Sequence, residues 1–181
     1  MKAEKNMIPH LKSIMMLSTT CLMLPITAQA QFSRNGNAPI EADADDIVNS
    51  AGVTILSGQV DVRQGDTRIL SDVMKIYGGS TGLGPDTGDV NRIEATGNFY
   101  YLTPDQEVRG NNGVYTKDSD TFTVTGDVIL LQGENVVTGD TLIYNLSTEK
   151  ARVVGSCKGR RCGSKGRVKI LIKNTGNQAS S

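Results

Sequence analysis

The sequence predicts an all-β fold, in which repeated antiparallel strands form a β-jelly-roll or V-shaped sandwich with open edge strands. Three observations support this prediction. A glycine-anchored unit repeats along the chain, apolar and polar residues alternate within each unit, and no segment after residue 30 sustains a 3.6-residue period. Because successive side chains of a strand point to opposite faces, such alternation is typical of strands with one buried face.

The repeat is anchored by Gly58, Gly97, Gly126 and Gly155, and each of these glycines follows a short alternating segment. The last three lie 29 residues apart, whereas the first two lie 39 apart. The ten extra residues fit a glycine-rich stretch at residues 78–87, which we interpret as a loop insertion.

Within a unit, Phe122, Val124, Val128 and Leu130 share one face, so the interior is expected to be apolar along its whole length. Residues with turn-forming backbone preferences separate the strands. These predicted turns lie at residues 64–66, 103–105 and 132–134 at one end of the units, and at residues 117–120 and 147–150 at the other. Each unit is therefore predicted to be two strands stacked on the next pair.

The first 30 residues have the features of a secretory signal: early lysines, a short apolar run, and small residues before a cleavage site between Ala30 and Gln31. Met1 or Met7 could be the start. The expected organisation is a cleaved signal at 1–30, a flexible segment at 31–39, the β domain at 40–173 and a flexible tail at 174–181. An uncleaved membrane anchor is the alternative, although the apolar run is short for a bilayer span of about 20 residues.

The composition excludes several kinds of chemistry. The single histidine, His10, lies in the predicted signal, so no Ser–His pair, Cys–His pair or histidine-ligated metal site is expected in the mature chain. Acidic pairs such as Asp43/Asp45 and Asp118/Asp120 fall at turns or strand ends, where aspartate is common. We therefore expect no enzymatic activity, no catalytic residue, no metal, no cofactor and no nucleic-acid partner.

Charge is distributed unevenly along the chain. Residues 31–149 contain 7 basic and 18 acidic residues, whereas residues 150–181 contain 9 basic and none acidic. The basic set could contact phosphate groups of a ligand or, as we prefer, form a solvated edge that repels like edges; it comprises Lys158, Arg160, Arg161, Lys165, Arg167 and Lys169. Cys157 and Cys162 are predicted to form a disulfide in an oxidising compartment.

Four short motifs resemble the OstA/LptA family in their order and spacing. They are Ile-Glu-Ala-Asp-Ala-Asp at 40–45, Leu-Ser-Gly-Gln-Val at 56–60, Thr-Gly-Asp-Val at 125–128, and Thr-Gly-Asp-Thr-Leu-Ile-Tyr at 138–144. The resemblance covers residues 40–172. The insertion at 78–87 and the loop from Cys157 to Cys162 depart from the family's pattern.

The resemblance implies a periplasmic protein that binds the lipid A part of lipopolysaccharide and stacks head to tail. It further implies an inner-membrane bitopic partner of the same fold at the N-terminal edge, and the periplasmic domain of the outer-membrane translocon at the C-terminal edge. The residues expected to line an apolar lipid-binding trough are Leu56, Val60, Val62, Met74, Ile76, Phe99, Tyr101, Tyr115, Phe122, Val124, Val128, Leu130, Leu142 and Tyr144.

Other interpretations of the same pattern remain open at this stage. The fourteen side chains could form a closed core, because protein interiors are normally close-packed. The chain could then be a purely structural β-repeat module without a lipid ligand. It could also be the inner-membrane-anchored sibling of the same fold.

Overall fold

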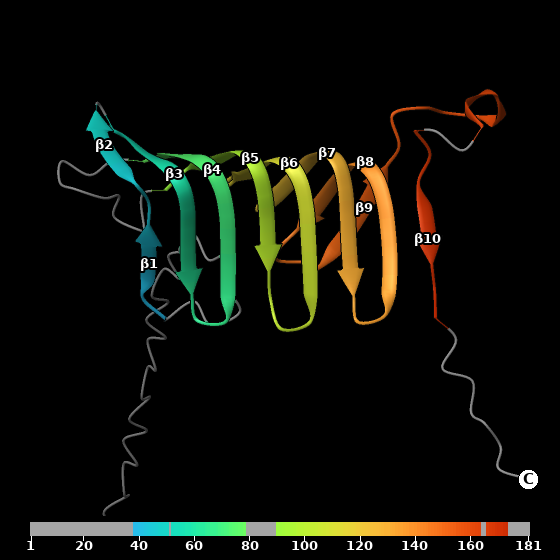
Figure 1. Ribbon diagram of the computed structural model, residues 1–181, viewed down its shortest axis with the longest axis horizontal. Helices are drawn as coiled ribbons and strands as arrows, with labels where there is room; N and C mark the ends of the chain where they lie inside the picture. The colour runs from blue at the N-terminus through green and yellow to red at the C-terminus, as the bar shows by residue number, and fades with distance from the viewer. Residues whose placement is uncertain (1–37, 51, 79–89, 164–165, 174–181) are drawn as a thin grey trace, which may run out of the picture.

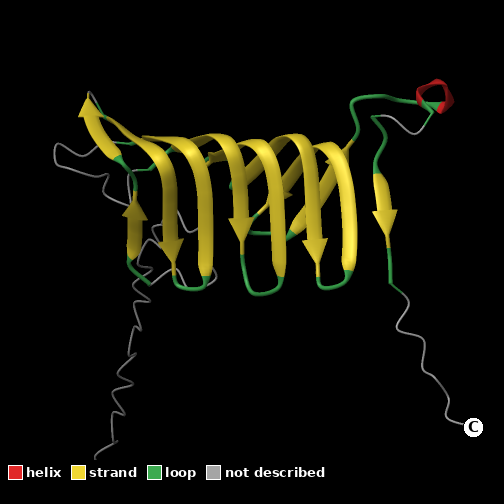
Figure 2. Cartoon of the chain, viewed as in Figure 1, coloured by secondary structure: helices red, strands yellow, loops and turns green. Residues whose placement is uncertain are grey.

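The computed structural model describes residues 38–50, 52–78, 90–163 and 166–173. The predicted signal peptide and all of the 78–87 insertion except Gly78 lie outside these residues. The described part contains ten strands and one short 3-10 helix (Figures 1 and 2). The elements are β1 (Ile40–Asp43), β2 (Asp46–Ser50), β3 (Val53–Gln64), β4 (Thr67–Tyr77), β5 (Arg92–Leu102), β6 (Gln106–Thr116), β7 (Thr121–Gln132), β8 (Asn135–Asn145), β9 (Lys150–Val154), η1 (Arg160–Cys162) and β10 (Lys169–Leu171).

All ten strands belong to one antiparallel sheet, which confirms the predicted all-β class. The long strands β3 to β8 pair in sequence order, and each edge is completed by two short strands. At the N-terminal edge, β1 pairs with one half of β3 and β2 pairs with the other. At the C-terminal edge, β9 and β10 divide β8 in the same way.

Each long strand bends near its middle, so the single sheet folds over into two facing layers (Figure 1). Every ladder between adjacent long strands shifts register at this point, for example between Thr96 and Phe99 where β5 meets β6. Three repeat glycines, Gly58, Gly97 and Gly126, lie at the bends with φ of about +80°, and the residue after each also has positive φ. Such angles favour glycine, which explains why this residue anchors the repeat.

A polar side chain covers each of these bend glycines: Asp45, from the link between β1 and β2, lies over Gly58, and the preceding long strand supplies the side chain at Gly97 and at Gly126. A Cβ added to Gly97 would lie 2.8 Å from the Asp72 carboxyl carbon, and one added to Gly126 would lie 2.5 Å from the Asn111 amide nitrogen. Asn98 also donates hydrogen bonds of 3.1 and 3.0 Å to the two carboxylate oxygens of Asp72. The bend is therefore closely packed as well as hydrogen-bonded.

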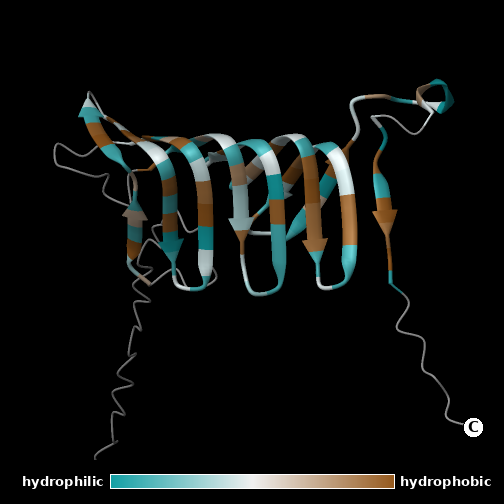
Figure 3. Cartoon of the chain, in the orientation of Figure 1, coloured by the Kyte–Doolittle hydropathy of each residue, from teal (hydrophilic) through white to brown (hydrophobic). Residues whose placement is uncertain are grey.

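The hydrophobic core fills the space between the two layers, and apolar residues alternate with polar ones along the strands (Figure 3). The expectation of an apolar interior along the whole length was wrong near β3 and β4. There the buried residues include Thr54, Gln64, Thr67 and Ser71, which alternate with buried apolar neighbours. The inner face is thus partly polar close to the N-terminal edge and apolar from β5 to β8.

The turns fall where the sequence predicted them. Gly65 and Asp66 connect β3 to β4, and Gly133 and Glu134 connect β7 to β8. Both glycines have φ of 58°, the left-handed geometry that two-residue hairpin turns require. These turns set the register that keeps the alternating apolar residues on the inner face.

Candidate functional site

The fourteen predicted trough residues all lie on the inner face of the folded sheet. Twelve of them are buried, and Ile76 and Tyr144 are half-buried. The buried members are Leu56, Val60, Val62, Met74, Phe99, Tyr101, Tyr115, Phe122, Val124, Val128, Leu130 and Leu142. The structure therefore brings the whole predicted set together between the layers.

An aromatic cluster connects the two layers at the centre of this interior. The Phe122 ring, from the first half of β7, lies 5.3 Å from the Phe99 ring and 5.6 Å from the Tyr101 ring, measured between centroids. Phe99 and Tyr101 come from the second half of β5, which belongs to the opposite layer. Tilted rings at this separation stabilise one another beyond the gain from burial alone.

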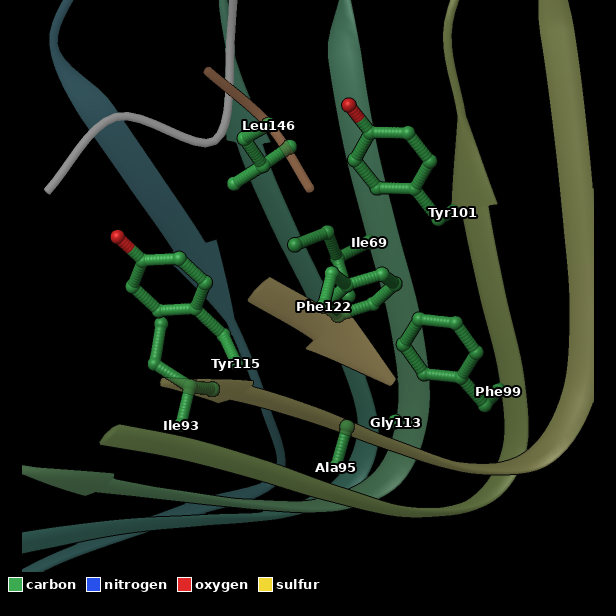
Figure 4. Close-up of a pocket in the computed structure, with 9 residues that line it drawn as sticks. All are labelled: Ile69, Ile93, Ala95, Phe99, Tyr101, Gly113, Tyr115, Phe122 and Leu146. Atoms are coloured by element: carbon green, nitrogen blue, oxygen red, sulfur yellow. The ribbon is translucent and has the colours of Figure 1, made fainter. Parts of the chain in front are cut away.

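Two small pockets lie between the layers. One is lined by the aromatic cluster together with residues such as Ile69, Ile93 and Leu146 (Figure 4). The other lies between Tyr101, Tyr144 and Ala151. Each pocket has room for about one water molecule. In this structure the side chains themselves fill the interior, so an acyl chain could enter only if the layers moved apart.

Five buried apolar residues of this interior were not among the predicted lining residues: Ile69, Val90, Ile93, Ala95 and Val108. The repeat contained the signal for two of them, because Ile93 and Ala95 lie 29 residues before Phe122 and Val124. Val90 lies just after the insertion, where the repeat offers no equivalent.

Polar groups lie at the rim of the interior. The Gln132 side-chain amide donates a 3.3 Å hydrogen bond to Gln106, and both residues line the second pocket. The Tyr115 hydroxyl donates a 3.3 Å hydrogen bond to Asp120. Burial, together with the charge of Asp120, raises the pKa of Tyr115 to about 12, so this hydroxyl is neutral at physiological pH.

Both ends of the apolar interior reach the edges of the sheet without a covering element among the described residues. Ile47 on β2 is 45% exposed, and Ile170 on β10 is 64% exposed. Their ladder partners, Leu56 and Val137, belong to the core or pack against it, which places both isoleucines on the inner face. Each edge therefore presents an exposed apolar side chain on the inner face, where another chain could extend the sheet.

The connection from β9 to β10 contains Cys157 and Cys162, together with all the basic residues named in the sequence analysis except Lys169. Cys157 and Cys162 form a disulfide with their Cα atoms 6.0 Å apart. Arg160 and Arg161 belong to the short helix η1, and both side chains are exposed. The disulfide closes a loop that lies beside the sheet edge, away from the pockets.

A charged cluster joins the N-terminal edge to the sheet. Arg68 donates to both carboxylate oxygens of Asp61, at 2.8 and 2.6 Å, and Arg63 donates to the same carboxylate. Arg63 also lies 3.6 Å from Asp43 on β1. The hydrogen bond from Arg68, supported by Arg63, lowers the pKa of Asp61 from 3.8 to about 2.

We expect the Asp61→Asn substitution to lower the free energy of unfolding by about 1–2 kcal/mol at neutral pH. The loss is no larger because the two arginines are half-exposed, and solvent screens their attraction to the carboxylate. A folded-state pKa below the unfolded value means that the ionised carboxylate stabilises the fold above about pH 4. That contribution is lost as the pH falls through about 2. Urea denaturation of both proteins across this range checks the prediction, and a difference that is constant down to pH 2 would contradict it.

Two further kinds of feature are absent from the described residues. No helix there is long and apolar enough to cross a membrane. Those residues also contain no group of three or more His, Cys, Asp or Glu side chains that could hold a metal ion.

Known proteins share both the fold and the sequence pattern. The crystal structure of LptH, described as the LptA homologous periplasmic component of the lipopolysaccharide transport device of Pseudomonas aeruginosa, superposes with a TM-score of 0.61. It is 19% identical, and the match covers 77% of this chain and 98% of that one. An uncharacterized protein of Rhizobium meliloti (strain 1021) is 29% identical over 135 residues, which is 72% of this chain and 71% of the relative.

The match to LptH establishes the likeness of the folds, namely a folded antiparallel sheet. The family model described as LptA/(LptD N-terminal domain) LPS transport protein matches residues 39–150, which is more than half of the chain and extends from just before β1 to the start of β9. The chain therefore belongs to the LptA/LptD N-terminal domain family of lipopolysaccharide transport proteins.

Proposed function

We propose that this protein is a secreted, periplasmic carrier that binds the lipid A part of lipopolysaccharide and passes it from an inner-membrane complex to the outer-membrane translocon. In this proposal, residues 1–30 are the cleaved secretory signal and residues 40–173 form the carrier domain. The observation that carries the proposal is the inner face, which is apolar from β5 to β8 and continues uncovered to the C-terminal edge.

The physical basis is the cost of exposing hydrocarbon to water. Each CH₂ group gains about 0.8 kcal/mol on burial, so an acyl chain leaves an apolar environment slowly unless another receives it. A series of folded sheets with aligned inner faces makes each step a transfer between similar surroundings. The carrier then needs no catalytic group, and the energy for directed transport must enter elsewhere.

Assembly follows from the edges. Exposed edge strands can pair with a strand of another chain through backbone hydrogen bonds. In the proposed bridge, the β1/β2 edge meets an inner-membrane bitopic partner of the same fold or the preceding copy. The β9/β10 edge meets the next copy or the periplasmic domain of the translocon.

Lipid entry requires the two layers to separate, because the pockets hold about one water molecule each. In this proposal the layers open at the strand ends far from the bends, and the presence of Gln106, Gln132 and Leu146 in the pocket linings supports that choice. The glycines at the bends then act as the hinge, and the aromatic cluster is the contact that acyl chains displace.

Photo-crosslinking in cells tests lipid contact directly. We expect a photoreactive amino acid at Val128 or Tyr144, on the inner face, to capture lipopolysaccharide. The matched controls are the adjacent positions Ile129 and Ile143, which point to the outer face because side chains alternate along a strand. The measurement is a lipopolysaccharide-reactive band at the mass of the protein after irradiation.

Capture from neither inner position, while the protein remains folded, would reject the carrier function and favour a purely structural β-repeat module. Sequencing of the mature N-terminus tests a different point. A start at Gln31 is expected for a free periplasmic protein, whereas an intact N-terminal segment would indicate the membrane-anchored sibling.

A further inference from the structure

The two edges of the sheet carry opposite charges. The N-terminal edge presents exposed carboxylates on β1, on β2 and at the link between them, namely Glu41, Asp43, Asp45 and Asp46, and residues 40–50 contain no basic side chain. From residue 150 onward the chain contains 9 basic and no acidic residues. The exposed members in the described residues are Lys150, Arg152, Lys158, Arg160, Arg161, Arg167, Lys169 and Lys173, the last of which pairs with Glu134.

Strand direction allows these edges to meet in continuous register. The first edge strands β1 and β2 run antiparallel to β3, in the direction of β4, β6 and β8. The last edge strands β9 and β10 run antiparallel to β8. A second copy whose β1 and β2 lie against β10 and β9 therefore continues the antiparallel alternation, with each short strand in the layer of its partner.

The alternation of side chains also matches across such a contact. On the inner face, Ala42 and Ile47 of one copy would continue the row that ends with Val153 and Ile170 of the other. On the outer face the carboxylates of the first edge would lie beside basic side chains of the last edge, such as Arg152 and Lys169. Opposite charges on neighbouring strands attract, and the apolar rows bury one another.

The disulfide loop is placed at the level of the acidic residues. The loop connects β9 to β10 at the level where the long strands β3 to β8 bend. Asp45, in the link between β1 and β2, lies at the same level on the opposite edge. The Cys157 amide donates a 2.9 Å hydrogen bond to the Gly166 carbonyl, which closes the base of the loop. The Cys157–Cys162 bond then restricts the conformations available to Arg160 and Arg161.

Charge also discriminates against the wrong pairings. Strand direction alone would permit two first edges, or two last edges, to pair antiparallel about a two-fold axis. In the first case the four carboxylates of one copy would face those of the other, and in the second case two basic edges would meet. Like-charge contacts of this kind reduce association and help to select one orientation.

We propose that the disulfide-closed basic loop of one copy docks on the acidic β1/β2 edge of a second copy, and that this contact sets the polarity of head-to-tail assembly. The inference rests on the proposed function, because it specifies how copies of the carrier join. It predicts association that weakens with salt, requires the charges at both edges and is enhanced by the disulfide.

The test uses the full secreted chain and two charge-reversal variants, R160E/R161E and E41K/D46K. Each variant alone is expected to self-associate about tenfold or more weakly than the original protein. An equimolar mixture of the two should regain association, because each type of edge again meets its opposite charge. Sedimentation velocity measures the oligomers, at about 50 mM and about 500 mM NaCl, and circular dichroism checks that each variant is folded.

Association that is unchanged in both variants, or a mixture that stays as weak as its components, would overturn the proposal, as would a chain that is monomeric throughout. A photoreactive group at Ile170 gives an independent check: the captured peptide should come from residues 40–50 of another copy. Capture of residues 150–173 would show two last edges together and would also overturn it. Reduction of the disulfide should weaken association without preventing folding.

Lipid binding separates this inference from the proposed function. The non-associating R160E/R161E variant should still bind lipid A, since its inner face is unaltered. Charge-dependent polar assembly by a protein that captures no lipid would reject the carrier function and leave the docking contact standing. Lipid capture by a protein whose assembly does not depend on charge would reject the docking contact and leave the carrier function standing.

Discussion

Replacement of Phe99 by alanine is expected to lower the free energy of unfolding by about 3–5 kcal/mol, the usual cost of a large-to-small change in a closed core. The Phe99 side chain is 0% exposed. Its ring contacts Phe122 from the opposite layer and lies over Gly113, where an added Cβ would be 2.5 Å from the ring. The cavity left by the substitution cannot close easily, because hydrogen bonds to neighbouring strands hold the backbone of β5 on both sides.

Tyr100→Ala is the matched control, since it removes an aromatic ring from the next position of the same strand. Tyr100 points to the outer face, where the Arg109 guanidinium lies 5.3 Å from its ring centroid. We expect this change to cost about 1 kcal/mol or less. Chemical denaturation of both variants measures the difference, and equal losses would show that Phe99 does not join the two layers as described.

A methyl group at the bend should have an effect of similar size. We expect Gly97→Ala to destabilise the protein by about 3 kcal/mol, of which roughly 1–2 kcal/mol reflects the left-handed backbone. The remainder comes from contact with Asp72, whose carboxylate would have to move away and release its hydrogen bonds from Asn98. Because the bend folds the two layers together, this variant should also unfold over a wider range of denaturant.

Gly52→Ala separates the two causes. Gly52 has the same φ of 80°, but, apart from its chain neighbours, no atom of the described residues lies within 4 Å of the Cβ position. Its substitution should therefore show only the backbone cost, and removing the Asp72 side chain should recover part of the stability of Gly97→Ala. Equal effects at the two glycines would mean that packing over the bend contributes nothing.

The repeat allowed much of the fold to be predicted, because local physical chemistry determines it. Alternation identified the inner face, and the fourteen predicted residues do lie together on it. The turns at Gly65 and Gly133 were predictable because few residues adopt their backbone angles. The spacing of Gly58, Gly97 and Gly126 marked a recurring position, although it did not reveal that each strand bends there.

Other features depended on contacts between residues far apart in the chain. Thr54 and Ser71 are buried near the N-terminal edge although they are polar. Successive side chains of a strand point to opposite faces whatever their type, so a polar residue at an inner position is buried as well. Asp61 owes its lowered pKa to arginines that register places beside it. The match between the acidic edge and the basic loop could be seen only once both were located at opposite ends of one sheet.

The strands, their inner faces, the turns and the family could all be predicted without coordinates, since they follow from residue type and a short repeat. The folding of the sheet at the bends, and the filling of the space between its layers by side chains, became evident from the three-dimensional arrangement. The volume of that space depends on how closely two layers approach, and this distance results from the bend geometry and from the side chains of all the strands together. A periodic pattern specifies the direction of each side chain and contains no measure of that distance.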